Sequence, residues 1–154
     1  MFDFITDLLS NPLFLSAAGG WLISQGSKVL YQSVKQHGLS PKTIFTSGGM
    51  PSSHTATVTG LLFGTLFHYG AGGFEFPMAL FFAFVVIYDA LNVRYQASEH
   101  GKALNWLAGH ECRDDSWFQN HKKFDEHLGH TFPEVAVGMA VGFGAAVLVR
   151  LFLC

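Results

Sequence analysis

The stretch Ser47-Gly48-Gly49-Met50-Pro51-Ser52-Ser53-His54, placed directly before an apolar run that begins at Thr55, decides how this chain folds. Its glycines allow a tight backbone turn, and its proline ends whatever element precedes it. Either Ser52 or Ser53 can cap the helix that follows, whose first N–H groups have no partner inside the helix. Such a helix start binds anions, and His54 adds a group that titrates near neutral pH. An ordinary loop with a capped helix is the alternative.

Composition indicates a membrane protein. Of the 154 residues, 49% are hydrophobic and only 13% are charged, whereas a typical soluble domain has about 25% charged residues. Segments 55–73, 76–93 and 135–154 contain almost no charge, and segment 11–36 is a weaker fourth. We therefore expect one all-α domain over residues 1–154, an integral membrane helical bundle of about four transmembrane helices plus a polar surface segment, since a span takes roughly 20 mostly apolar residues.

Charge and cysteine content argue against other classes of protein. A net charge of −2 gives no sign of nucleic-acid binding. Asp3 and Asp7 stand where a signal peptide would carry basic residues, so we expect no cleaved signal peptide. Cys112 lies in the polar stretch and Cys154 ends the last apolar segment, which predicts two free thiols.

Helix-breaking residues predict the order of elements. A short amphipathic lead-in covers residues 1–10, and longer helices cover about 12–35, 53–69, 77–106 and 131 to the end, with a polar loop or surface helix over 109–123. Antiparallel crossings then place eight of the nine Lys and Arg residues, all except Arg150, on one side. The positive-inside tendency makes that side cytoplasmic.

The segment His130-Thr131-Phe132-Pro133-Glu134 places an imidazole four residues before a carboxylate. On one helical turn the two side chains can meet, and Glu134 can hold one ring nitrogen so that the other is a directed nucleophile. The alternative is a surface histidine beside a helix start whose dipole favours Glu134.

Four further charged residues lie near the same side of the predicted bundle. Lys28 and Lys35 are two helical turns apart on one face and suit either a phosphate or anionic lipid head groups. Asp89 and Arg94 lie in or near an apolar helix, where ionisable residues usually pair or mark a site, although Arg94 equally suits an interfacial anchor. The histidines in this part of the chain match no metalloprotease or Cys-rich pattern, so we expect no metal ion.

Together these residues resemble the divergent branch of the type-2 phosphatidic acid phosphatase (PAP2) superfamily, which is related to the vanadium haloperoxidases. The resemblance covers about residues 11–144 and rests on Gln25 to Lys28, Ser47 to His54, Asp89-Ala90, Val93-Arg94, Leu104-Asn105, Leu128 to Thr131 and Glu134-Val135. Relative to the wider superfamily, Lys35 replaces an arginine, Ser53 replaces the glycine of Pro-Ser-Gly-His, and Glu134 replaces an aspartate. Lys123 and Phe124 stand where a Ser-Arg pair would precede the histidine.

The resemblance implies hydrolysis of a lipid or isoprenoid phosphate monoester or pyrophosphate, without a metal or other cofactor. His130 would attack phosphorus to form a phosphohistidine, Glu134 would orient it, and His54 would protonate the leaving oxygen. The phosphate-binding residues, with Asp89 in support, would be Lys28, Lys35, Arg94, Gly49, Ser52 and Ser53. Arg94 or Lys123 would supply the cation of the missing Ser-Arg pair, because phosphoryl transfer depends on positioning and electrostatics.

The implied partners are a membrane lipid phosphate and the bilayer itself, with no nucleic acid. Four helices are few for a closed pocket, so a homodimer is compatible with the sequence. Two other functions stay open. The missing Ser-Arg pair favours a head-group binding protein without turnover, whereas a small transporter is disfavoured because its pathway needs polar groups near the bilayer midplane.

Overall fold

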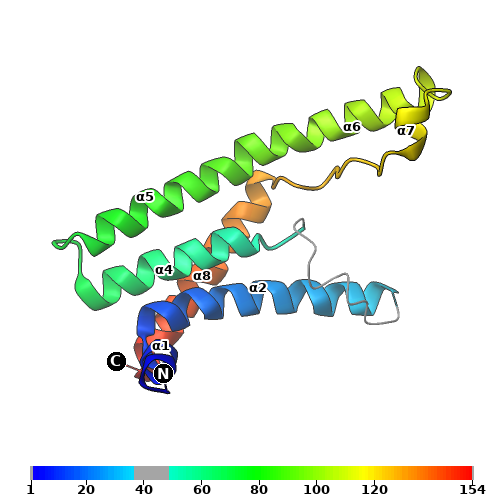
Figure 1. Cartoon of the computed structure of the whole chain (residues 1–154). Coiled ribbons are helices and arrows are strands. Elements are labelled where there is room, and N and C mark those ends of the chain that lie inside the picture. The colour runs from blue at the N-terminus through cyan, green and yellow to red at the C-terminus, as the bar shows by residue number, and fades with distance from the viewer. Residues whose placement is uncertain (1, 37–48, 154) are drawn as a thin grey trace.

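A computed structural model of the chain describes residues 2–36 and 49–153, and all of the regular structure in these ranges is helical (Figure 1). The elements are α1 (Phe2–Ser10), α2 (Pro12–Gln36), α4 (Ser53–Tyr69), α5 (Glu75–Tyr88), the π-helical turn η1 (Asp89–Val93), α6 (Arg94–His110), α7 (Ser116–Asn120) and α8 (Phe132–Leu153). The prediction of an all-α fold is confirmed.

Local capping explains where the first long helices begin. The Asn11 side-chain oxygen accepts the N–H groups of Leu13, at 2.9 Å, and Phe14, at 3.1 Å, so α2 begins at the predicted proline. The hydroxyl of Ser52 accepts the N–H of Thr55 at 3.4 Å, so Ser52 is the cap and α4 begins one residue later. These bonds satisfy N–H groups that a helix start otherwise leaves unpaired.

Helices α2, α4 and α8 pack against one another through small residues. A Cβ atom on Gly20 of α2 would lie 2.5 Å from the carbonyl oxygen of Ala56 in α4, and one on Gly138 of α8 would lie 2.7 Å from that of Ser52. Glycine is therefore needed at both positions for these backbones to come so close. Small residues are typical of helix contacts in a bilayer, where lipid is as apolar as any side chain and close packing holds helices together.

Helices α5, η1 and α6 form one continuous helix of 36 residues, Glu75–His110. Its α5 part packs on α4 through the buried Ala79 and Ala83, while Phe81 and Phe84 are 69% and 64% exposed. At about 1.5 Å per residue the helix is about 54 Å long, which exceeds the roughly 30 Å of a bilayer core. The α6 end, where charged residues gather, therefore has the length to project beyond a membrane.

Among the described residues, two helices are long and apolar enough to cross a membrane, Glu75–His110 and Phe132–Leu153. The other two predicted spans are α2, which carries several polar residues, and α4, which has 17 residues. Because α2 and α4 both pack against α8, which crosses them in Figure 1, they are the candidates for the remaining crossings, and the number of four stays a prediction.

The close packing of α8 on α4 can be tested by comparing substitutions at two glycines of α8. We expect Gly138→Ala to lower the free energy of unfolding by about 1–3 kcal/mol, because its methyl group meets the Ser52 carbonyl. Gly144→Ala is the matched control, since a Cβ there meets no atom of the described residues within 4 Å. Denaturant unfolding in detergent, followed by circular dichroism, measures both. Equal stability of the two variants would contradict the packing described here.

Candidate active site

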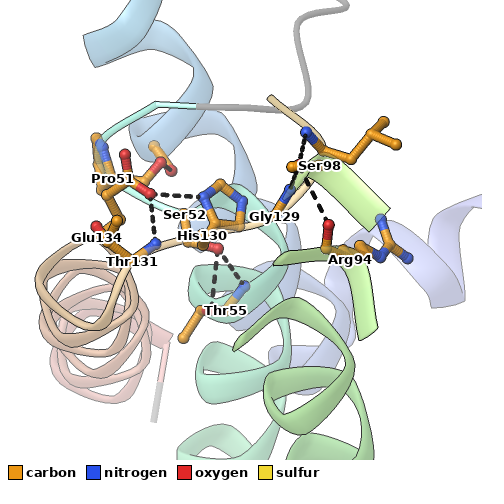
Figure 2. A network of polar contacts seen from close by, with 11 residues as sticks. Pro51, Ser52, Thr55, Arg94, Ser98, Gly129, His130, Thr131 and Glu134 are labelled. Carbon is orange, nitrogen blue, oxygen red and sulfur yellow. Dashed lines mark hydrogen bonds and ion pairs between the residues drawn. The ribbon is translucent and has the colours of Figure 1, made fainter. Parts of the chain in front are cut away.

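The middle of α2 and the starts of α4 and α8 are joined by hydrogen bonds to main-chain groups. The Ser24 hydroxyl of α2 donates to the carbonyl of Pro51 at 3.0 Å, next to the start of α4. The N–H of Ser52 in turn donates to the carbonyl of Glu134, in the first turn of α8, at 3.1 Å. The turn before α4 is therefore fixed between two helices, with its polar groups beside those of α8 (Figure 2).

His130 lies just before α8 and is 2% exposed. Its Nδ1 atom lies 3.2 Å from Oε2 of Glu134, and the same oxygen accepts the N–H of Thr131 at 2.8 Å. A carboxylate only accepts hydrogen bonds, so Nδ1 carries the proton and Nε2 carries the lone pair. Nε2 is buried and has no hydrogen-bond partner in the described part of the chain. The predicted spacing of histidine and acid thus produces a held imidazole with one free nitrogen.

Burial lowers the pKa of His130 below the usual 6.5 of a free histidine. The hydrogen bond and charge of Glu134 act in the opposite direction, and the positive charges of Lys28 and Arg94 add to the lowering. Because the pKa falls, the ring is neutral at neutral pH and keeps its lone pair. That is the protonation state that a nucleophile needs.

Lys28, which the sequence analysis placed near this site, is 3% exposed on α2. Its Nζ atom is buried and makes no hydrogen bond to any described residue. An isolated buried charge is unfavourable, so an anion that contacted Nζ would satisfy it, and the phosphorus of a bound phosphoryl group could approach the lone pair on Nε2 of His130. This is the feature of the site that most clearly fits a phosphoryl group.

His54 and Arg94 complete the cluster from α4 and from the start of α6. The rings of His54 and His130 have centroids 6.4 Å apart and an interplanar angle of 57°. Arg94 forms an ion pair through Nε with Oδ2 of Asp89, and both side chains are more than a third exposed. The structure thus brings six predicted residues together from α2, α4, η1, α6 and the start of α8, namely Lys28, His54, Asp89, Arg94, His130 and Glu134.

The remaining predicted residues lie in different surroundings. Gly49 is exposed, with a φ of +89° that favours glycine, while the Ser52 hydroxyl is fully buried and serves as the cap of α4. Ser53 is 6% exposed at the first position of that helix. Lys123 does not join the cluster and lines a separate cavity beside α7 with Asn105.

Some predictions fall outside the residues that the structure describes. The side chain of Lys35 is one, and Gly48 of the opening turn is another. Among the described residues, no group of three or more His, Cys, Asp or Glu side chains is arranged to hold a metal ion.

Two features of the site were missed by sequence reasoning. One is the π-helical turn η1, where an unbroken α-helix was expected, and the other is the contact of Ser98 with the segment before His130. No glycine or proline marks η1, and a serine in the middle of a helix carries no signal of a partner 30 residues away. Neither feature had a local signature to find.

Comparisons with known proteins agree with the resemblance. The model of a family described as the divergent PAP2 family matches residues 9–145. The chain is also 30% identical over 155 aligned residues to a protein of Bacillus subtilis named "Uncharacterized membrane protein YuiD", covering 95% of this chain and 98% of that protein. No solved structure matches the chain significantly.

The histidine at the centre of the cluster gives a prediction on pH. NMR titration of ring-labelled histidine in detergent should show His130 gaining its proton only below pH 6.5, because burial opposes the charged form. Glu134→Gln should move this midpoint further down, since it removes the negative charge that favours protonation. His130→Gln identifies the signal. A midpoint at or above 6.5 in the unaltered chain would contradict the burial argument.

Proposed function

We propose that this chain, which belongs to the divergent PAP2 family, is an integral membrane phosphatase that acts through a phosphohistidine and without a metal. Its substrate is a phosphate monoester or pyrophosphate on a lipid or isoprenoid. The observation that carries the proposal is the free, buried Nε2 of His130, whose other ring nitrogen is held by Glu134. Membership in the family supports a PAP2-related membrane protein, and the chemistry is inferred from the side chains.

In the first step the lone pair on Nε2 of His130 attacks phosphorus and forms a P–N bond. The P–O bond to the leaving group breaks, and the departing oxygen takes a proton from His54, whose protonated form the negative charge of the bound phosphate favours. The two rings are near enough for one phosphoryl group to contact both. During attack His130 becomes positively charged, which the carboxylate of Glu134 stabilises through Nδ1.

In the second step a water molecule attacks the phosphohistidine. His54, now neutral, accepts a proton from that water, and the P–N bond breaks to release inorganic phosphate. Lys28 and Arg94 stabilise the negative charge on the phosphoryl oxygens in both steps, as expected for a reaction dominated by positioning and electrostatics. Atoms and protons balance over the cycle, and the protein returns to its starting state.

A lipid substrate fits the position of the site in the fold. The cluster lies where α4 and α8 begin, beside the second half of α2, and large apolar side chains cover the outer face of α5. A lipid would keep its chains along such apolar surface while its head group enters the cluster. The distribution of Lys and Arg favours the cytoplasmic side for this end of the bundle.

A second candidate is a head-group binding protein without turnover. It is favoured by the ion pair between Arg94 and Asp89, which neutralises the cation that would replace the missing Ser-Arg pair. Under this candidate the cluster binds phosphate through Lys28 and the start of α4 but does not transfer it.

Removal of the nucleophile tests the first proposal. We expect His130→Ala to lower the rate of phosphate release at least about 10³-fold, as loss of a nucleophile does in other enzymes. Purified protein in detergent is assayed on phosphatidate, phosphatidylglycerophosphate and polyprenyl mono- and diphosphates, with and without a chelator. His127→Ala is the control, because that histidine is exposed and outside the cluster. A His130→Ala protein as active as the unaltered chain would refute the mechanism.

The Asp89–Arg94 pair tests how the cluster binds phosphate, and a parallel assay of phosphate release separates the two candidates. Asp89→Asn frees the guanidinium, so inorganic phosphate should bind about 2- to 5-fold more tightly, the range expected for a partly exposed ion pair. Arg94→Ala should weaken binding. Calorimetry measures both variants, and the phosphate-release assay runs in parallel. Tight binding with no release on any substrate would favour the binding protein over the phosphatase.

A further inference from the structure

The π-helical turn η1 changes which carbonyl groups are used inside the long helix. The N–H of Arg94 bonds to the carbonyl of Asp89, five residues back, whereas an α-helix would pair it with that of Ala90. The Ala90 carbonyl instead accepts the N–H of His130 at 3.1 Å. The turn therefore provides a main-chain acceptor for the residue proposed as nucleophile.

One turn further along, the hydroxyl of Ser98 contacts the segment that leads into His130. It accepts the N–H groups of Leu128 at 2.9 Å and Gly129 at 3.1 Å, and it donates to the carbonyl of Arg94 at 3.2 Å (Figure 2). Ser98 is 4% exposed, so its hydroxyl is buried and makes three hydrogen bonds within the protein. Without it, two partly buried N–H groups would lose their acceptor.

The segment comes close enough for these bonds because residue 129 is glycine. A Cβ atom at Gly129 would clash with the main chain of Tyr95 in α6. Three consecutive residues, 128 to 130, therefore bond through their N–H groups to the η1–α6 part of the long helix. Glu134 in α8 holds only the ring of His130, from the other side.

We propose that Ser98, together with the Ala90 carbonyl freed by η1, forms a clamp that sets the position of His130 relative to the phosphate-binding cations. Ser98 is then a positioning residue that touches no substrate. This inference rests on the proposed function, since it assigns a role in aiming the nucleophile. The clamp fixes the main chain of the histidine from one helix while Glu134 fixes its ring from another.

Two oxyanions measure separately how the His130 ring is oriented and how strongly the site binds an anion. Inorganic phosphate needs only the cations and N–H groups of the site. Orthovanadate can in addition accept a ring nitrogen as a fifth ligand, so its affinity also depends on where Nε2 of His130 points. The ratio of the two dissociation constants therefore depends on the orientation of the His130 ring, and it can be measured without turnover.

We expect Ser98→Ala to reduce the preference for vanadate over phosphate by about 10-fold or more, since small misplacements of a reacting group have effects of this order. Phosphate affinity should change by less than about 2-fold. Ser98→Thr keeps the hydroxyl and should restore most of the preference. Thr65→Val is the matched control, because it removes a buried hydroxyl that bonds to the carbonyl of Leu61 in its own helix.

Gly129→Ala is a second variant that keeps the Ser98 hydroxyl but displaces the segment, and it should lose the vanadate preference in the same way. Circular dichroism confirms that each variant is folded. Equal loss of both affinities, an unchanged ratio in Ser98→Ala, or no vanadate preference in the unaltered chain would overturn the clamp. Failure to release phosphate from any lipid, with the Ser98-dependent preference intact, would overturn the phosphatase and leave the clamp standing.

Discussion

Backbone contact between helices α2, α4 and α8 is the constraint on which the rest of the structure depends. Glycines at these contacts bring main-chain atoms of neighbouring helices together, as at Gly20 against Ala56 and Gly138 against Ser52. Larger side chains would separate the axes, and the N–H of Ser52 could then no longer reach the carbonyl of Glu134. Packing in the apolar part of the bundle therefore determines the geometry of the polar end.

The site that results is fixed by bonds to main-chain groups, and serine side chains supply two of the partners. The Ser24 hydroxyl holds the turn before α4, and the Ser98 hydroxyl holds the segment before α8. His130 is held by α8 through its ring and by the long helix through its N–H. Any movement of α6 relative to α8 would act directly on this residue.

Local signals account for what the sequence predicted well. The start of α4 follows from a proline and a capping serine, and the contact of His130 with Glu134 follows from a spacing of four residues. The burial of Lys28 and the partners of Ser98 were not predictable, because both depend on how distant segments pack. The length of α6 beyond residue 106 was also missed, since its polar sequence resembles a loop in composition.

The two cations of the cluster differ in whether they already have a partner, and this difference affects how an anion would bind. Arg94 is partly exposed and already paired with Asp89, so a phosphoryl group would have to exchange with a carboxylate to gain its full charge. Lys28 is buried with no partner among the described residues, so an anion that reaches it relieves an existing penalty. Affinity should therefore come mostly from Lys28. Arg94 is better suited to respond to the additional negative charge that develops during transfer, because only then does exchange with Asp89 become favourable.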